Sequence, residues 1–177
     1  NYFFGLQSFK LCEWCKSLSR WWLDGLVSKV NDIAFRADAS EQIGSGHVTR
    51  CLTLADSLRE HGAKCRFICR AHEGNLIDLI VKQGYLVNAL PKVSAGTQAS
   101  EAVIPHINWL GVDWETDAHQ TKLVLDKAKT DWLIVDHYGL DHRWEMFMRP
   151  SCKKIMVIDD LADRQHKCDL LLDQNYG

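Results

Sequence analysis

Short apolar runs that alternate with helical patterns are the feature that most restricts the fold of this chain. Continuous apolar runs occur in DWLIVDHYG at 131–139, KKIMVIDDLA at 153–162 and CDLLLDQ at 168–174. A strand that is buried on both faces is apolar along its whole length, as is typical of parallel sheets. The pattern therefore predicts an α/β fold in which helices cover both faces of a parallel sheet.

From residue 32 onward, strands and helices are expected to alternate. Gly62 and Gly84 follow amphipathic segments and supply the backbone angles that a helix end needs. The pattern is weakest over 91–116, where PKVSAGTQAS is loop-like. The expected strands are 32–38, 64–71, 85–90, 131–139, 153–162 and 168–174, and the expected helices are 47–62, 74–84, about 109–129 and 141–152, the last ending near Pro150.

Residues 1–30 differ from the rest and are expected to form an amphipathic, aromatic-rich extension. Apolar residues recur there at helical spacing, including Trp14 and Trp22, with charged residues between them. These charges exclude a membrane span, and the segment lacks the long apolar core of a signal peptide. It is expected to lie as a helix at a membrane interface, to pack on a partner or on the domain, or to be foreign to a native domain that begins near Val30 and covers 31–177.

Composition narrows the class of protein. The chain has 177 residues and a net charge of −2 without a basic stripe, so we expect one domain and no nucleic-acid partner. Most of the seven cysteines lie in apolar settings, which is typical of reduced thiols in a cytoplasmic protein. Cys12 and Cys15 form a lone CxxC without a second pair at zinc spacing, so no metal or cofactor is expected.

Polar residues gather where the expected strands end. Asp38 follows the first strand, and Asp136, His137 and Tyr138 end the fourth. The acidic pair at 159–160 ends the fifth strand, and either binds a metal or caps the next turn. Because ligands of parallel sheets bind at the carboxyl ends of strands, one sheet edge is expected to hold these groups.

The GSGH loop joins the first strand to the first helix. Gly44 and Gly46 either shape the turn or leave backbone amides bare around Ser45 for a phosphate or a sugar hydroxyl. The spacing matches neither GxGxxG nor a P-loop. His47 is then either a capping residue or a neutral imidazole that acts as a general base. Arg50 is expected to pair with phosphate or with a carboxylate such as Asp38, or to be solvated.

The remaining histidines fall into two classes. His137, with Tyr138 beside it, either packs at the sheet edge or belongs to the site. The other histidines show no partner pattern and are expected at the surface or in loops: His61, His72, His106, His119, His142 and His166.

Three blocks together resemble a known family. FRADASEQIGSGHVTRCLTLADSLR, LIVDHYGLDHRWE and VIDDLADRQHKCDLLLDQN are similar, in order and spacing, to the amino-terminal half of the UDP-sugar hydrolases of pseudaminic acid biosynthesis. The resemblance runs from about Ile33 to Asn175. It implies a Rossmann-like domain of a two-domain, GT-B-type, MurG-like architecture.

The resemblance also implies an activity. It is hydrolysis of a UDP-linked 2,4-diacetamido-2,4,6-trideoxy-altropyranose at the anomeric carbon, with inversion, release of UDP and no metal. His47 and Tyr138 are expected to be catalytic. The residues expected to bind substrate are Asp38, Gly44, Ser45, Gly46, Arg50 and His137.

The chain ends where the family's second, nucleotide-binding domain would begin, so that domain is expected to be absent and the chain to be a fragment. Two alternatives remain open. One is a GT-B-type glycosyltransferase, and the other is a non-catalytic sugar-binding module with residues 1–30 as its docking helix. The sequence leaves the oligomeric state open.

Overall fold

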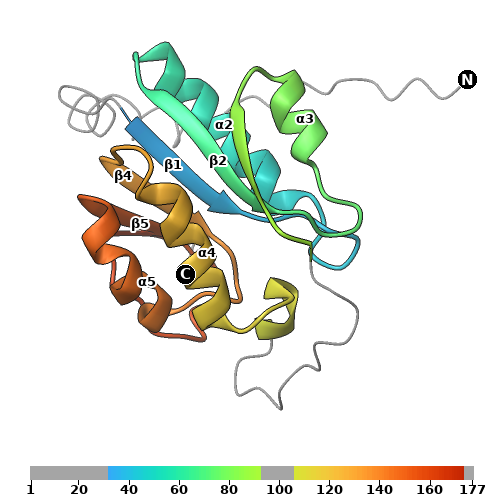
Figure 1. Ribbon diagram of the computed structural model, residues 1–177, viewed down its shortest axis with the longest axis vertical. Coiled ribbons are helices and arrows are strands. Elements are labelled where there is room, and N and C mark those ends of the chain that lie inside the picture. The colour runs from blue at the N-terminus through green and yellow to red at the C-terminus, as the bar shows by residue number, and fades with distance from the viewer. Residues whose placement is uncertain (1–31, 93–105, 174–177) are drawn as a thin grey trace, which may run out of the picture.

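The computed structural model describes residues 32–92 and 106–173, and in this part of the chain it contains a six-stranded, wholly parallel sheet of order β3-β2-β1-β4-β5-β6 (Figure 1). The strands are β1 Asp32–Ala37, β2 Lys64–Arg70, β3 Leu86–Leu90, β4 Trp132–Asp136, β5 Lys154–Ile158 and β6 Leu170–Leu172. The helices are α2 Gly46–Glu60, α3 Ile77–Lys82, α4 Trp114–Leu125 and α5 His142–Met148, with 3-10 turns η1 Ile107–Leu110 and η2 Arg149–Ser151.

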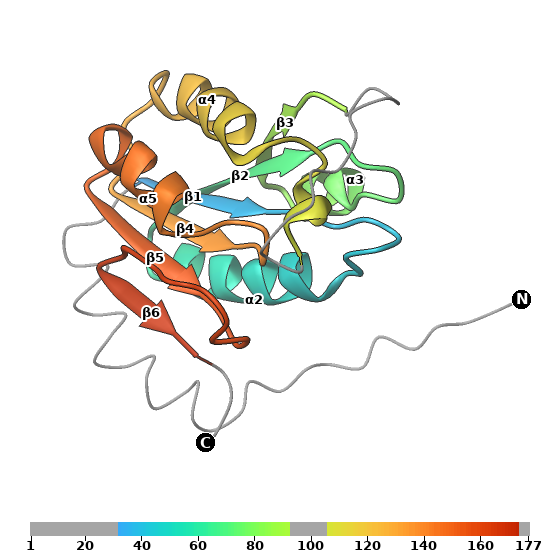
Figure 2. The ribbon, with the colours of Figure 1, turned by 90° about the horizontal axis from the view of Figure 1, so that it is seen from below.

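Helices cover both faces of the sheet, as the apolar runs predicted. Figure 2 shows α4 and α5 above the sheet and α2 below it. Alternate residues of β1 enter two separate cores, because successive strand side chains point to opposite faces. Ile33 and Phe35 pack with residues of α2 and α3, and Ala34 packs with residues of α4 and α5.

The order of the strands places a topological switch point between β1 and β4. The chain moves outward from β1 to β3 and then returns to the other side of β1 as β4. Such a reversal leaves the loops after the two central strands diverging, and ligands of open α/β sheets bind at this point. The loops after β1 and β4 contain the GSGH and DHYG segments.

The strands and helices expected from residue 32 onward are all present, and most are shorter than expected; α4, for example, begins at Trp114 and not at about 109. The helix expected to run to about 129 ends at Leu125, and α5 ends at Met148 before the 3-10 turn that contains Pro150. Asp113 and Asp141 begin α4 and α5 by accepting hydrogen bonds from the backbone N–H groups of Thr116 and Arg143. The extension at 1–30 and most of the loop at 91–100 lie outside the described residues.

The thiols of the described segments are free, as expected: Cys51, Cys65, Cys69, Cys152 and Cys168. Burial raises the pKa of Cys69 to about 12 and the pKa of Cys51 well above its ordinary value. Both thiols are therefore protonated and unreactive near neutral pH.

Within the described ranges, no helix combines the length and apolar character that crossing a membrane requires.

A buried ionic cluster joins the sheet to its upper helices. Arg36 donates to both oxygens of Asp38, at 2.6 and 2.9 Å, and to Asp117 of α4 at 2.6 Å. Arg70 of β2 donates to the same oxygen of Asp117 at 2.6 Å. The indole of Trp144 in α5 donates to the other oxygen at 3.0 Å. All four charged residues are at most 1% exposed.

The cluster holds two positive and two negative groups, so it places no net charge in the core. Burial alone would raise the pKa of Asp117, but the neighbouring Arg36 guanidinium outweighs burial and lowers it. The opposing carboxylates raise the pKa of Arg36 despite its burial. The four charges stabilise one another, and the Arg70 backbone N–H also donates to Asp38 at 2.7 Å, so the cluster fixes Asp38 at the end of β1.

Replacing Asp117 by Ala is therefore expected to be severely destabilising. The change leaves two buried guanidinium groups short of a partner, and we expect the free energy of unfolding to fall by about 3–5 kcal/mol. Chemical denaturation would measure the loss. The matched control is Asp126→Ala at the end of the same helix, where an exposed pair with Lys122 makes about 0–1 kcal/mol the expected cost. Equal losses in the two variants would contradict the role given to the cluster.

Candidate functional site

Strand register explains why polar groups meet beyond the ends of β1, β4 and β5. Ala37 of β1 lies opposite Asp136 of β4, so the next residues of the two strands are also level. Val135 of β4 lies opposite Val157 of β5, which brings Tyr138 level with Asp160 three residues further on. The expected convergence of strand ends at one sheet edge is thus confirmed.

The GSGH loop is held by a turn that only glycine closes easily. The Ser40 hydroxyl accepts hydrogen bonds from the backbone N–H groups of Gln42 and Ile43, and Gly44 then adopts a φ of +77°. Ser45 is the N-cap of α2 but makes no side-chain hydrogen bond to its first turn. The N–H groups at the start of α2 are therefore left for solvent or for an anionic ligand.

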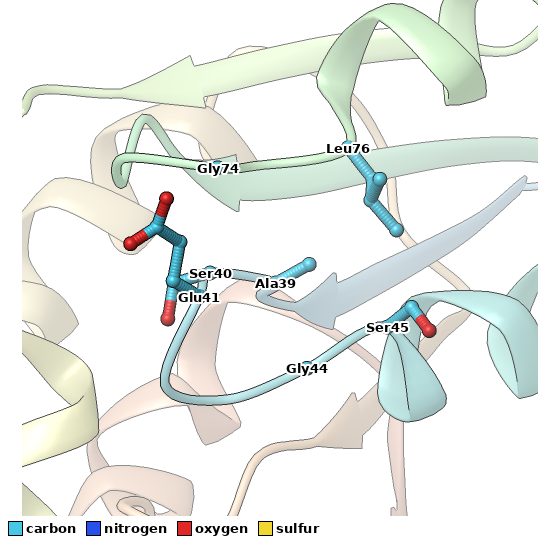
Figure 3. A pocket seen from close by; sticks show the side chains of 7 residues that line it. All are labelled: Ala39, Ser40, Glu41, Gly44, Ser45, Gly74 and Leu76. Carbon is cyan, nitrogen blue, oxygen red and sulfur yellow. The ribbon is translucent and has the colours of Figure 1, made fainter.

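A shallow pocket of about 270 Å³ borders this loop (Figure 3). Its lining residues are Ala39, Ser40, Glu41, Gly44, Ser45, Gly74 and Leu76. Ala39 and Leu76 supply apolar side chains, and the Glu41 side chain extends toward Gly74, where an added Cβ would lie 2.9 Å from Glu41 Cγ. The loop thus borders an open hollow and leads directly into His47.

His47 is oriented by a buried carboxylate. Its Nδ1 lies 2.5 Å from Oδ1 of Asp136, and both residues are buried. Burial would raise the pKa of Asp136, but hydrogen bonds from Arg50 and His47 outweigh it and lower the pKa. An ionised carboxylate accepts hydrogen bonds only, so we assign the proton of neutral His47 to Nδ1. Nε2 is then the basic nitrogen.

Arg50 joins two carboxylates on neighbouring strands. Its Nε and Nη2 donate to the two oxygens of Asp136 at 2.5 and 2.6 Å, and Nη1 donates to Asp160 at 3.2 Å. Pairing of Arg50 with a carboxylate is confirmed, but the partners are Asp136 and Asp160 and not Asp38, which belongs to the buried ionic cluster. A bidentate guanidinium holds the Asp136 carboxylate in a fixed plane, which in turn fixes the partner of His47.

Tyr138 packs its ring against His47 and binds Asp160 through its hydroxyl. The two ring centroids are 4.4 Å apart with an edge-to-face angle of 75°. The hydroxyl donates to Oδ1 of Asp160. Burial, followed by this hydrogen bond, raises the pKa of Tyr138 to about 12, so the phenol is protonated near neutral pH.

Asp38 and His137 are buried next to each other, directly after β1 and β4. His137 is 2% exposed, its Nδ1 accepts from the Gly139 backbone N–H at 3.0 Å, and its Nε2 lies 3.3 Å from Asp38. Burial is the main cause that lowers the pKa of His137, which favours the neutral ring. Binding of substrate by Asp38 and His137 stays a prediction, and their burial favours a supporting role.

His166 lies in a loop, as expected, but its side chain is buried and not at the surface. Its side chain is 6% exposed, with Nδ1 2.6 Å from Glu145 of α5 and Nε2 3.4 Å from Asp159. Asp159 also accepts from Arg164 at 2.8 Å and caps the turn after β5 through the Ala162 N–H at 3.2 Å. These contacts hold the segment that contains Asp160.

A metal at the acidic pair was the other interpretation of 159–160. Its two carboxylates have separate partners, because Asp159 caps the turn and Asp160 binds Tyr138 and Arg50. Across the described ranges, no group of three or more His, Cys, Asp or Glu side chains is arranged to hold a metal ion.

Four residues of the site are not among the catalytic and substrate-binding residues predicted from the sequence. Asp136 and Asp160 were noted only as strand ends, although a carboxylate that ends a buried strand is a usable signal. His106 and Trp109 come from the segment before α4, and their rings contact each other at a centroid distance of 4.5 Å and a tilt of 48°. Trp109 also lies 5.9 Å from the ring of Tyr138.

The fold and site together define a Rossmann-like α/β domain with a carboxylate-oriented histidine at the topological switch point. A curated relative is the UDP-2,4-diacetamido-2,4,6-trideoxy-beta-L-altropyranose hydrolase of Campylobacter jejuni, 31% identical over 144 residues and 81% of this chain. The chain spans 41% of that relative's length. No family model matches the chain. The comparison supports a distant relationship to a nucleotide-sugar hydrolase.

Protonation of His166 is expected to stabilise the fold at lower pH. Burial lowers its pKa, but the hydrogen bond to Glu145 outweighs burial, so the folded pKa lies above 6.5. The stability gained is fully present below this ordinary value and is lost as pH rises through the folded pKa. Denaturation at about pH 6 and about pH 9 should show a smaller gap between wild type and His166→Gln at the higher pH.

The matched variant for this pH prediction is Glu145→Gln, which removes the opposing charge. Its gap from wild type should also shrink toward high pH, because the same protonated pair is lost. If the difference in stability from wild type is constant with pH in both variants, the pair of His166 and Glu145 contributes through packing alone.

Proposed function

We propose that this chain forms the catalytic-histidine half of a nucleotide-sugar hydrolase. The proposed substrate is a UDP-linked diacetamido-trideoxy sugar, which is hydrolysed at the anomeric carbon with inversion. The observation that supports this most strongly is the contact between His47 Nδ1 and Asp136 at the switch point of the sheet. The distant similarity to a hydrolase named for this substrate supports the choice of sugar.

In the proposed reaction His47 acts as the general base. Its Nε2 accepts a proton from water while the water oxygen forms a bond to the anomeric carbon. The bond between that carbon and the diphosphate oxygen breaks, and the electron pair leaves with UDP. Water enters on the face opposite the departing group, so the configuration inverts. Asp136 stabilises the imidazolium that forms, as the carboxylate does in other His–Asp pairs.

The departing diphosphate needs charge stabilisation more than it needs a proton, because UDP is a good leaving group. We propose that the bare N–H groups at the start of α2 provide it, aided by the positive end of the helix. The loop glycines allow close approach, since an added Cβ at Gly44 or Gly46 would meet nothing within 4 Å. Binding of the uridine is proposed to lie in the part of the relative that this chain does not span.

Replacing His47 by Asn should abolish turnover while the fold survives. Loss of a general base is expected to lower kcat by about 10²–10⁴-fold. The assay is UDP release from the altropyranose nucleotide, without added metal, by the longest polypeptide whose reading frame contains this chain. The matched control is His61→Asn, an exposed histidine at the other end of α2.

Three outcomes would contradict this proposal. Undiminished release by His47→Asn would remove His47 from the mechanism. Transfer of the sugar to an added acceptor in preference to water would favour the glycosyltransferase. Saturable binding of the nucleotide sugar with no release would favour the binding module.

Asp136→Asn tests the orientation of His47 separately from the base itself. An amide can donate to Nδ1, which favours the wrong tautomer, and we expect kcat to fall by about 10²–10⁴-fold with little change in KM. The control is Asp56→Asn on the outer face of α2, where Asp56 pairs with Arg59. A rise in KM with unchanged kcat would instead assign Asp136 a role in binding the substrate.

A further inference from the structure

An aromatic group beside His47 has no part in the proton transfer described above. Trp109 lies 6.4 Å from the His47 ring, nearly perpendicular to it at 87°, and 5.9 Å from Tyr138 at 31°. The His106 ring lies 4.5 Å from the Trp109 ring, tilted by 48° to it, and 5.7 Å from the ring of Tyr138. Trp109 is only half-buried, whereas His47 is buried. The indole thus forms a partly exposed apolar surface next to the proposed base.

The position of this surface is fixed by its own short element. Leu110 of η1 is fully buried in the core between the sheet and α4 and α5. Gly111 ends the turn with a φ of +74°. On the other side the His106 carbonyl approaches the DHYG turn so closely that an added Cβ at Gly139 would lie 3.0 Å from it. Trp109 is therefore held at a defined place relative to Tyr138.

The proposed substrate offers a chemistry that matches this surface. Its name specifies acetamido groups at C2 and C4 and a deoxygenated C6, so the sugar carries acetyl methyl groups and a C6 methyl group where an ordinary hexose carries hydroxyls. Sugar sites place apolar and aromatic side chains against such groups and use a few polar atoms for orientation. A tryptophan face supplies a large apolar contact at a small cost in conformational entropy.

We propose that Trp109, with the His106 ring tilted against it, is the wall that selects the methyl-bearing sugar. The inference rests on the proposed function for the identity of the sugar, but it concerns binding and not turnover. Trp109 acts as a specificity-determining residue that packs against the acetamido or C6 methyl groups while His47 faces the anomeric carbon.

Titration of the ¹⁵N-labelled chain with the free diacetamido-trideoxy sugar tests this wall directly. The indole N–H signal of Trp109, assigned from its loss in Trp109→Phe, should shift saturably with this sugar and not with glucose. Trp109→Ala should weaken binding by about ten-fold, and Trp109→Phe by less, because an aromatic face remains. The matched control is Trp114→Phe, a half-buried tryptophan of α4 that packs against Arg143.

The outcomes separate this wall from the hydrolase. A Trp109 signal that shifts with the sugar, in a protein that releases no UDP, would uphold the wall and overturn the hydrolase. UDP release with an unmoved Trp109 signal, or with equal affinity in wild type and Trp109→Ala, would overturn the wall. Equal shifts with glucose would overturn its selectivity for methyl groups.

Discussion

The carboxylate of Asp136 is the group on which the rest of the site depends. It ends a fully buried strand, and it accepts hydrogen bonds from His47 on one oxygen and from Arg50 on both. Arg50 supplies the positive charge that keeps the carboxylate ionised in this buried place. The ionised carboxylate then determines which nitrogen of His47 is basic. One ion pair therefore sets both the orientation and the chemistry of the histidine.

The charges of the domain fall into two groups with different tasks. Asp38 belongs to the fully buried cluster, where Arg36 binds both of its oxygens. Asp136 belongs to a second group, with His47, Arg50 and Asp160, in which Arg50 is partly exposed. His137 lies between them, near Asp38 and one residue after Asp136. Parallel register makes this arrangement possible, because it aligns the ends of β1 and β4.

Sequence patterns predicted the fold well because burial on both sheet faces leaves a direct trace in the apolar runs. They also predicted the convergence of His47 with Tyr138, since both follow strands that end at one edge. Pairings between distant side chains were beyond this reasoning. Arg50 lies 86 positions from Asp136 in the chain, and His166 meets a glutamate on a separate helix. Trp109 was missed because its 3-10 turn has no repeating pattern to read.

The closed charge balance of the buried ionic cluster also restricts how this domain can change over generations. Arg36 and Arg70 face Asp38 and Asp117, so replacing any one of them strands a charge in the core. An apolar core of similar volume is a stable alternative, but it is reached only when several positions change together. A single substitution at any of these four positions is strongly destabilising, so the four residues are expected to change only together. The backbone at the end of β1, which leads into the GSGH loop, is therefore fixed by the cluster, while substitutions in surface loops do not disturb it.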